Sequence, residues 1–293
     1  MSIKIITDSC CDLPLDYVEA LHEGLTVIGM PIQFENKTII DDLGKTYEHK
    51  TFYDLLRRGV MPSTSQINAY RFEMAFKEAV ASGYDVIYLG FSSGMSGTFN
   101  SAIIAKSLIL EQFPHAKIEV VDTLCASVGQ GALIIEALKR IRDDAYTFEK
   151  LIAWVEDKKY YFHHWFGVND LNYLRNGGRI SPTTALVGNV LHVKPTLTVD
   201  CHGVLKSHNN VRGRKKSLTL LEQKVKLHLD KTASNVILLG HGNCFDDALL
   251  LKEMLEQGQD HPTVMLTELS MTIASHVGPD MIAVAFLGDR RDS

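Results

Sequence analysis

The sequence predicts an α/β protein of two domains, residues 1–160 and 161–293. Through the first half, short runs of β-branched residues alternate with segments of helical period, which indicates a mostly parallel sheet with helices on both faces. Past residue 165 the pattern changes to a hairpin and several further strands, which indicates an α+β domain with a mixed sheet. The 293 residues exceed one typical domain. Since the chain has no internal repeat and no Pro/Gly-rich linker, only this change of pattern sets the boundary.

In the first domain, several of the expected helices have a recognisable start or stop. The strand at residues 3–6 leads to a helix that Asp12 caps and whose first turn holds Pro14. Thr51 caps another helix, which Gly59 ends. The further strands are expected at residues 25–34, 85–91 and 117–122, and the further helices at 69–81, 99–112, 126–143 and 147–163.

The second domain begins with a short helix at residues 171–175, and Ser181-Pro182 is expected to cap another. A hairpin follows at residues 195–199 and 204–207, because Gly203 supplies the positive φ angle that its turn requires. The remaining helices are expected at residues 214–229 and 245–255, and the remaining strands at 235–240, 263–269 and 281–286.

Composition and charge exclude several classes of protein. Apolar residues make up 45% of the chain and charged residues 22%, which is ordinary for a globular protein. The net charge of −5 leaves no general basic footprint, so we expect no nucleic-acid partner. The one basic cluster, residues 212–216, is interpreted as a solvated helix start, with contact to a partner protein as the alternative.

Cysteine content and hydropathy indicate where the protein works. The five cysteines are odd in number and lack framework spacing, which indicates free thiols in a reducing compartment. Residues 1–13 lack the apolar core of a signal peptide, and no run approaches the roughly 18 apolar residues of a spanning helix. We therefore expect a cytoplasmic protein.

Three polar turns carry the strongest functional signal. They are Thr7-Asp8-Ser9, Ser63-Thr64-Ser65-Gln66 and the Ser/Gly run at residues 92–98, and each follows a strand or opens a helix. In a doubly wound sheet such ends share one edge, where ligands bind in a crevice. Backbone N–H groups and hydroxyls gathered there suit a phosphate, an oxyanion or a carboxylate. The alternative for each turn is that it is only a helix cap.

Acyl hydrolysis and nucleotide binding have weaker support. Ser96 lies on a strand-to-helix turn, as a hydrolase nucleophile does, but the pattern G-x-S-x-G fails at Thr98. Gly24 and Gly29 have the spacing of a phosphate-binding loop, yet the lysine and hydroxyl that should follow are missing.

The histidines give no clear metal signal. His163 and His164 are adjacent and therefore point apart, and no other pair has ligand spacing, so no metal site is expected. His276 differs because a Gly-Pro turn is expected to fix its backbone between two strands.

Taken together and in order, these residues resemble the DegV family, bacterial fatty-acid-binding proteins that serve fatty acid kinases as carriers. The matching segments in the first half are Thr7-Asp8-Ser9, Asp12-Leu13-Pro14, Pro62-Ser63-Thr64-Ser65-Gln66 and Ser92-Ser93-Gly94-Met95-Ser96-Gly97-Thr98 with Ser101-Ala102. Those in the second half are Val168-Asn169-Asp170-Leu171-Asn172-Tyr173-Leu174, Gly177-Gly178-Arg179-Ile180, Lys194-Pro195, Arg212-Gly213 and His276-Val277-Gly278-Pro279. Three residues depart from the family's pattern: Met95, Asn169 and Asp280.

The resemblance implies one long-chain fatty acid, such as palmitate, stearate or oleate, in a tunnel between the two domains. It implies that the carboxylate is held by the two hydroxyl turns and a late histidine, and that an arginine balances its charge; the matching residues are Thr64, Ser65, Ser93, Ser96, Gly97, His276 and Arg179.

The resemblance also implies a carrier that is not itself catalytic and needs no cofactor. Its partners would be the catalytic subunit of a fatty acid kinase and, transiently, a membrane surface. Two alternatives stay open. One is a serine hydrolase or acyltransferase that uses Ser96 with His276, and the other is a lipid-sensing regulator that binds a partner through residues 212–216.

Overall fold

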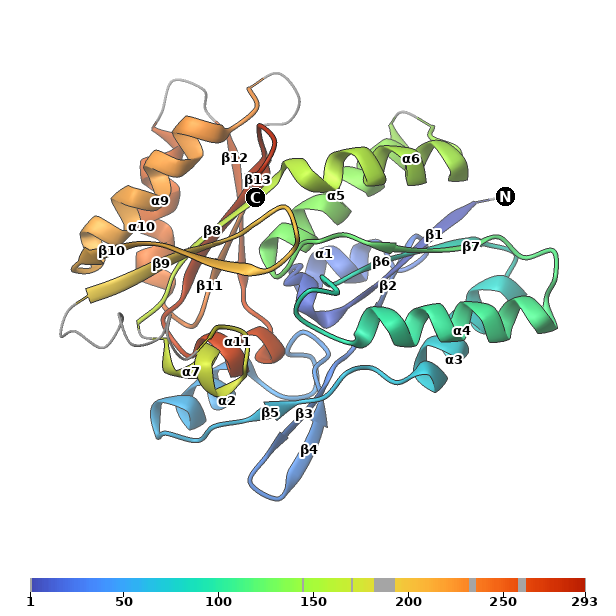
Figure 1. Cartoon of the computed structure of the whole chain (residues 1–293), viewed down its shortest axis with the longest axis horizontal. Coiled ribbons are helices and arrows are strands. Elements are labelled where there is room, and N and C mark those ends of the chain that lie inside the picture. Colours follow the sequence, from blue (N-terminus) through green and yellow to red (C-terminus); the bar gives the residue numbers. More distant parts are fainter. Residues whose placement is uncertain are drawn as a thin grey trace.

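The computed structural model describes residues 2–143, 145–169, 171–181, 193–231, 236–257 and 262–292, which form three sheets and their covering helices (Figure 1). The first sheet is parallel throughout, with the strand order β2-β1-β6-β7. All six residues of its central strand β6 are buried, as expected for a strand covered on both faces. The strands are β1 (Ile3–Asp8), β2 (Leu25–Ile28), β6 (Asp85–Gly90) and β7 (Ile118–Asp122). The parallel sheet predicted for the first half is thus confirmed.

Helices cover both faces of this sheet, as predicted. On one face α3 (Ala69–Ala81) and α4 (Thr98–Gln112) lie side by side, and on the other lie α5 (Val128–Arg142) and α6 (Phe148–Lys158) (Figure 1). The short helix α1 (Leu15–Ala20) follows β1. Residues 128–137 of α5 are all buried, because this helix is sandwiched between the first sheet and the six-stranded sheet. Gly131 permits the close approach, since a Cβ there would overlap the carbonyl oxygen of Cys11.

The second half forms a mixed six-stranded sheet with the order β10-β9-β8-β13-β11-β12, which confirms the mixed sheet predicted there. Only β11 and β12 are parallel neighbours. Helices α9 (Arg214–His228) and α10 (Phe245–Glu256) cover the face opposite α5. The strands are β8 (Phe162–Gly167), β9 (Val193–Val199), β10 (Leu205–Arg212), β11 (Val236–His241), β12 (Thr263–Glu268) and β13 (Ile282–Leu287). The predicted β9–β10 hairpin is present, and the basic cluster at 212–216 begins α9.

A third, antiparallel sheet of three short strands lies below the other two in Figure 1, with the order β4-β3-β5. Its strands are β3 (Pro31–Phe34), β4 (Lys37–Ile40) and β5 (Ser63–Thr64). Against it pack three helices, α2 (His49–Arg57), α7 (Asn172–Asn176) and α11 (Met271–Val277). Because α7 and α11 come from the second half, this layer joins the two halves of the chain.

Five predictions about elements are wrong. Asp12 does not cap α1, which begins after Pro14, and Thr51 does not cap α2, which begins after Glu48; neither helix has a side-chain cap. Residues 25–34 are not one strand: β2 ends at Ile28, and β3 begins at Pro31 in another sheet. The helix predicted at 147–163 ends at Lys158, and the histidine pair belongs to β8, whose neighbours β9 and β13 come later in the chain. His276 does not lie on a turn between strands but in α11, where the side chain of Ser270 caps the helix.

The largest apolar core contains residues of both halves, including Ile5, Leu133 and Ala285. All strands of the six-stranded sheet follow residue 160 and all strands of the other sheets precede it; the domain boundary at 160 stays a prediction. The helix expected after Ser181-Pro182 lies outside the described residues, as does Asp170. Among the helices that the structure describes, none is long and apolar enough to cross a membrane.

Candidate functional site

A cavity lies between the first sheet and the six-stranded sheet, with about 720 Å³ of space that no atom fills, part of it open to solvent. The cavity reaches the carboxyl ends of β2 and β6, through Met30 and Phe91, which is the edge where the sequence predicted a ligand. Most of its wall is apolar, and the six-stranded sheet contributes Trp165, Phe166, Val199, Leu205, Ala283 and Val284.

One part of the wall is polar, and four of the predicted site residues gather in it: Thr64, Ser96, Arg179 and His276. They come from β5, the turn before α4, the segment after α7, and α11. The structure therefore brings together side chains that are separated by up to 212 residues in the sequence.

Thr64 and His276 are in direct contact, with 2.8 Å between the threonine Oγ1 and the histidine Nε2. The other ring nitrogen, Nδ1, is buried and has no partner in the part of the chain that the structure describes. Burial, with a smaller contribution from the nearby Arg179, lowers the pKa of His276 to about 4. The imidazole is therefore neutral at neutral pH, and with Thr64 it can present one hydroxyl or ring donor to an anion.

Arg179 is fixed by two backbone carbonyls. Its Nε donates to the carbonyl of Met95 at 3.1 Å, and one terminal nitrogen donates to the carbonyl of Gly177 at 2.5 Å. Partial burial lowers the pKa of the guanidinium, which still stays charged at neutral pH. It is the only lysine or arginine among the described residues that line the cavity, so it supplies the positive charge of this end.

Ser96 lies at the start of α4, where Gly97 is the N-cap residue. Its hydroxyl donates to Thr98 Oγ1 at 3.0 Å and accepts from the backbone N–H of Thr98 at 3.2 Å. The positive end of the helix dipole thus faces the polar part of the cavity.

The other predicted site residues do not line this cavity. Ser65, Ser93 and Gly97 are exposed. The backbone N–H of Ser65 donates to the carbonyl of Pro31, and that of Ser93 donates to the carboxylate of Asp122. Their roles in binding a carboxylate stay predictions.

The chain is similar to known proteins over almost its whole length. A model of the DegV family, described as an uncharacterised protein family, matches residues 2–289. The chain belongs to the DegV family. A DegV domain-containing protein of Clostridium perfringens is 38% identical over 288 residues, which cover 98% of each chain. Another, from Lactococcus lactis, is 36% identical over 285 residues, which cover 97% of each.

Solved DegV structures share the whole fold. A fatty-acid-binding DegV protein from Thermus thermophilus superposes with a TM-score of 0.83 at 27% identity, covering 98% of this chain and 100% of that one. DegV of Bacillus subtilis, a fatty-acid-binding protein, superposes with a TM-score of 0.83 at 26% identity, covering 99% and 100%. The fold that surrounds the cavity is therefore the fold of proteins that bind fatty acids.

Two departures from the DegV pattern, Asn169 and Asp280, contact each other. The amide of Asn169 donates to the carboxylate of Asp280 at 2.8 Å, and Arg57 donates to the same carboxylate at 2.9 Å. Asp280 has a φ angle of +63°, a region that favours glycine. These two hydrogen bonds offset the backbone strain at Asp280, so Asn169 stabilises the unusual conformation of Asp280.

The sequence analysis missed two polar residues that also line the cavity, Ser127 and Thr272. Ser127 Oγ donates to the buried Asp12 at 2.5 Å, and Thr272 Oγ1 donates to the buried Asp41 at 2.5 Å. Burial raises the pKa of both carboxyls, that of Asp12 to about 7. No local pattern marks these pairs, because each joins residues more than 100 positions apart.

Proposed function

We propose that the cavity binds one long-chain fatty acid, with its acyl chain along the apolar wall and its carboxylate at Thr64, Ser96, His276 and Arg179. The observation that carries this proposal is a mostly apolar cavity whose described wall holds one charged group, Arg179, beside Thr64, Ser96 and His276, built on the fold of fatty-acid-binding proteins. A ligand that fits must itself have one polar end and a long apolar body, which describes a fatty acid.

The acyl chain supplies the affinity in this arrangement. Burying about 14 methylenes at roughly 0.8 kcal/mol each gives on the order of 11 kcal/mol before the costs of binding, whereas a head-group hydrogen bond contributes about 1 to 3 kcal/mol. The polar end therefore orients the ligand. Since Arg179 is charged and His276 is neutral, the bound carboxylate stays ionised with one cation nearby.

An ionised carboxylate among the polar residues of the cavity suits a carrier. We infer that this chain presents the acid to the catalytic subunit of a separate fatty acid kinase, which makes the acyl phosphate, and that it contacts a membrane surface transiently to exchange lipid. The protein needs no cofactor of its own for this role.

The geometry disfavours the hydrolase alternative. A serine nucleophile needs a base within hydrogen-bond reach. The hydroxyl of Ser96 donates to Thr98, and the described contact of His276 Nε2 is to Thr64. A fluorophosphonate probe is expected to leave Ser96 unlabelled, and stoichiometric labelling at that residue would favour the hydrolase.

Mass spectrometry of an organic extract from the denatured protein tests the binding proposal, together with titration of the delipidated protein with oleate. Near-stoichiometric fatty acid in the extract and saturable binding are expected. Thr64→Val removes the hydroxyl at the polar end while keeping the shape of the side chain, and its matched control is Ser65→Ala on the exposed neighbour. Absence of fatty acid from the extract, combined with no binding of added oleate, would refute the proposal.

The carrier role has its own test, which is formation of acyl phosphate from ATP by a purified fatty acid kinase catalytic subunit in the presence of the loaded protein. Turnover that is the same with and without this chain would contradict the carrier role while leaving fatty-acid binding intact.

A further inference from the structure

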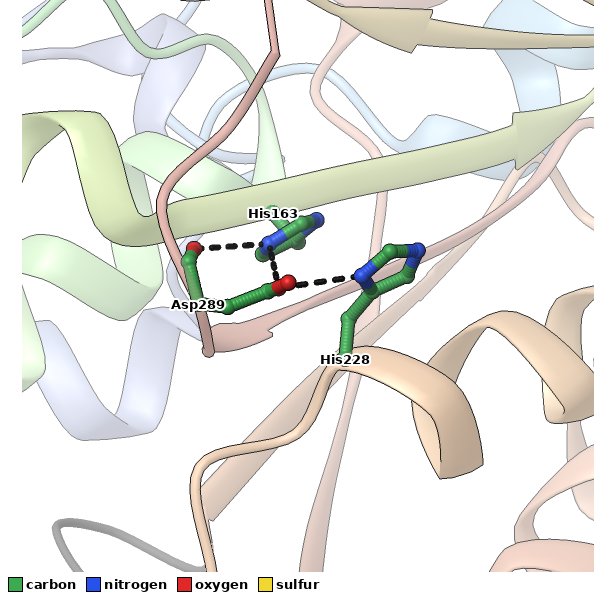
Figure 2. Close-up of side chains that lie close together, drawn as sticks. All are labelled: His163, His228 and Asp289. Carbon is green, nitrogen blue, oxygen red and sulfur yellow. Dashed lines mark hydrogen bonds and ion pairs between the residues drawn. The ribbon is translucent and has the colours of Figure 1, made fainter.

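A second cluster of reactive side chains lies away from the cavity, and Figure 2 shows its three members facing one another: His163, His228 and Asp289. His163 belongs to β8, His228 ends α9, and Asp289 follows β13. The Oδ1 atom of Asp289 lies 2.9 Å from His163 Nε2 and 2.9 Å from His228 Nδ1. The three ligand atoms all lie within 4.8 Å of one another.

The surrounding structure holds these groups in place. The ring of His163 is stacked between Phe286, at 5.3 Å, and His228, at 4.7 Å, measured between ring centroids. The backbone N–H of Asp289 donates to the carbonyl of His228 at 3.1 Å. Gly288 permits this approach, because a Cβ there would lie 2.8 Å from His163 Cδ2, closer than real Cβ atoms come. The cluster is therefore part of the packed fold.

The cluster is open to solvent on one side. The side chains of His163, His228 and Asp289 are 5%, 20% and 63% exposed. His228 and Asp289 also line a surface groove. A group bound between the three ligand atoms can thus keep a position for water.

We propose that His163 Nε2, His228 Nδ1 and the carboxylate of Asp289 bind a divalent cation of the zinc class, with water as the fourth ligand. Two imidazoles and one carboxylate are a ligand set that zinc prefers. Tetrahedral coordination at 2.0–2.2 Å needs ligand atoms about 3.4 Å apart. The oxygen is already near this separation from both nitrogens, at 2.9 Å from each.

Loading the site requires one rearrangement. The two imidazole planes are 20° from parallel, whereas each lone pair lies in the plane of its ring and must point at the same ion. His228 lies at the end of a helix and is partly exposed, and a turn about χ2, a torsion with broad preferences, would re-aim its ring. This turn would give up the stacking of the ring on His163 and on Trp165, which the bonds to the ion must offset. His163 Nε2 now contacts the backbone carbonyl of Asp289 at 2.9 Å, and His228 Nδ1 contacts its carboxylate at 2.9 Å. Bonds to the ion replace both contacts, with release of the ring protons that made them.

The ion would stabilise the segment that follows β13. Two residues after Asp289, the buried guanidinium of Arg291 donates to four backbone carbonyls, those of Leu124, Lys159, Val199 and Asp200. A cation on Asp289 ties this segment to both β8 and α9. The expected role is therefore structural, and it does not depend on what the cavity binds.

Titration of the metal-free protein with Co²⁺, followed by competition with Zn²⁺, tests the site. One equivalent should bind with the visible absorption of tetrahedral cobalt, and Zn²⁺ should displace it and raise the melting temperature. His228→Gln and Asp289→Asn are expected to weaken Zn²⁺ binding more than about tenfold. The matched control, His202→Gln on the exposed turn at residues 200–203, should bind as the unchanged protein does.

Zn²⁺ binding by both variants that equals binding by the unchanged protein, or no binding by the unchanged protein at micromolar Zn²⁺, would overturn the proposal. Should the variants fail to fold, X-ray absorption of the zinc-loaded unchanged protein decides. Two histidine nitrogens and oxygen ligands support the site, and sulfur ligands from the five free cysteines would refute it.

Discussion

Gly177→Ala isolates the contribution of His276 to the head-group site. Gly177 has a φ angle of −73°, which alanine adopts without strain, so the substitution acts only through space. A Cβ at this position would overlap His276 Nδ1 at a separation below 3.0 Å, which real Cβ atoms essentially never show. Ordinary contact begins at 3.4 Å, so the ring has to move by several tenths of an ångström or more. The 2.8 Å contact between His276 and Thr64 is then lost or misaligned.

The expected result is weaker binding of the head group with the acyl-chain contacts kept. Losing one or two hydrogen bonds to a carboxylate costs about 1 to 3 kcal/mol, which corresponds to a rise of about 5- to 150-fold in the Kd for oleate. Isothermal titration of the delipidated protein measures this change. Gly24→Ala is the matched control, because its Cβ meets only the carbonyl of Leu21, at 3.9 Å, far from the site. An affinity of folded Gly177→Ala within twofold of the unchanged protein would refute the assignment of His276 to the head group.

Three further predictions concern pH, chain length and the Ser/Gly turn. Burial raises the pKa of Asp12 in the folded protein to about 7, from an ordinary value of about 4 in the unfolded chain. The contribution of the protonated carboxyl to stability is therefore fully present below about pH 4 and is lost as the pH rises through 7. Asp12→Asn should therefore gain stability relative to the unchanged protein between those pH values in urea titrations, and a difference independent of pH would contradict this. Ala283 lines the cavity, so the larger side chain in Ala283→Leu takes space from the acyl chain. Binding of stearate should weaken by about 2 kcal/mol more than binding of dodecanoate. Equal losses for both acids would count against an acyl chain that lies along β13. Ser92→Ala removes the buried hydroxyl that donates to the carbonyl of Gly203 at 2.7 Å, and the free energy of unfolding should fall by about 1 to 3 kcal/mol, whereas the exposed neighbour Ser93→Ala should change it by less than about 0.5 kcal/mol. Equal effects of these two serine variants would show that the contact with Gly203 does not stabilise the fold.

Local patterns predicted the elements whose signals lie within a few residues. The glycine at the end of α2 and the hairpin turn at Gly203 were confirmed, because a glycine acts on the backbone next to it, whereas the caps predicted at Asp12 and Thr51 were wrong. Strand β8 was missed because its pairing partners come 29 or more residues later in the chain, and a strand is stabilised by those partners. Helix α11 was missed for a similar reason, since carboxylates from the first half satisfy its first N–H groups.

The site residues, like the elements of the fold, were predictable only where a local pattern or the family resemblance marked them. The hydroxyl turns with Thr64 and Ser96 were visible as turns, and the family resemblance supplied Arg179 and His276. The sequence did not separate Thr64 from its neighbour Ser65, because Thr64 belongs to the two-residue strand β5, whose pairing with β3 decides its place, whereas Ser65 follows that strand and is exposed. The pairing of His163 with His228 was also hidden: adjacent histidines do point apart, but each can still meet distant partners.

Helix α11 connects ligand binding to the joint between the two halves of the chain. At its start, the backbone N–H groups of Ser270 and Thr272 donate to two buried carboxyls of the first half, Asp12 and Asp41. At its last turn, His276 meets Thr64, which also belongs to the first half. The helix that places His276 is therefore held by the first half at both ends. A fatty acid whose carboxylate contacts both Thr64 and His276 bridges the same joint, so its binding adds to the stability of the folded protein in proportion to the logarithm of ligand concentration over Kd. The buried carboxyls at one end of α11 and the lipid carboxylate proposed at the other would thus be bound in a similar way, by hydroxyl and N–H donors, with Arg179 as the added charge at the lipid end.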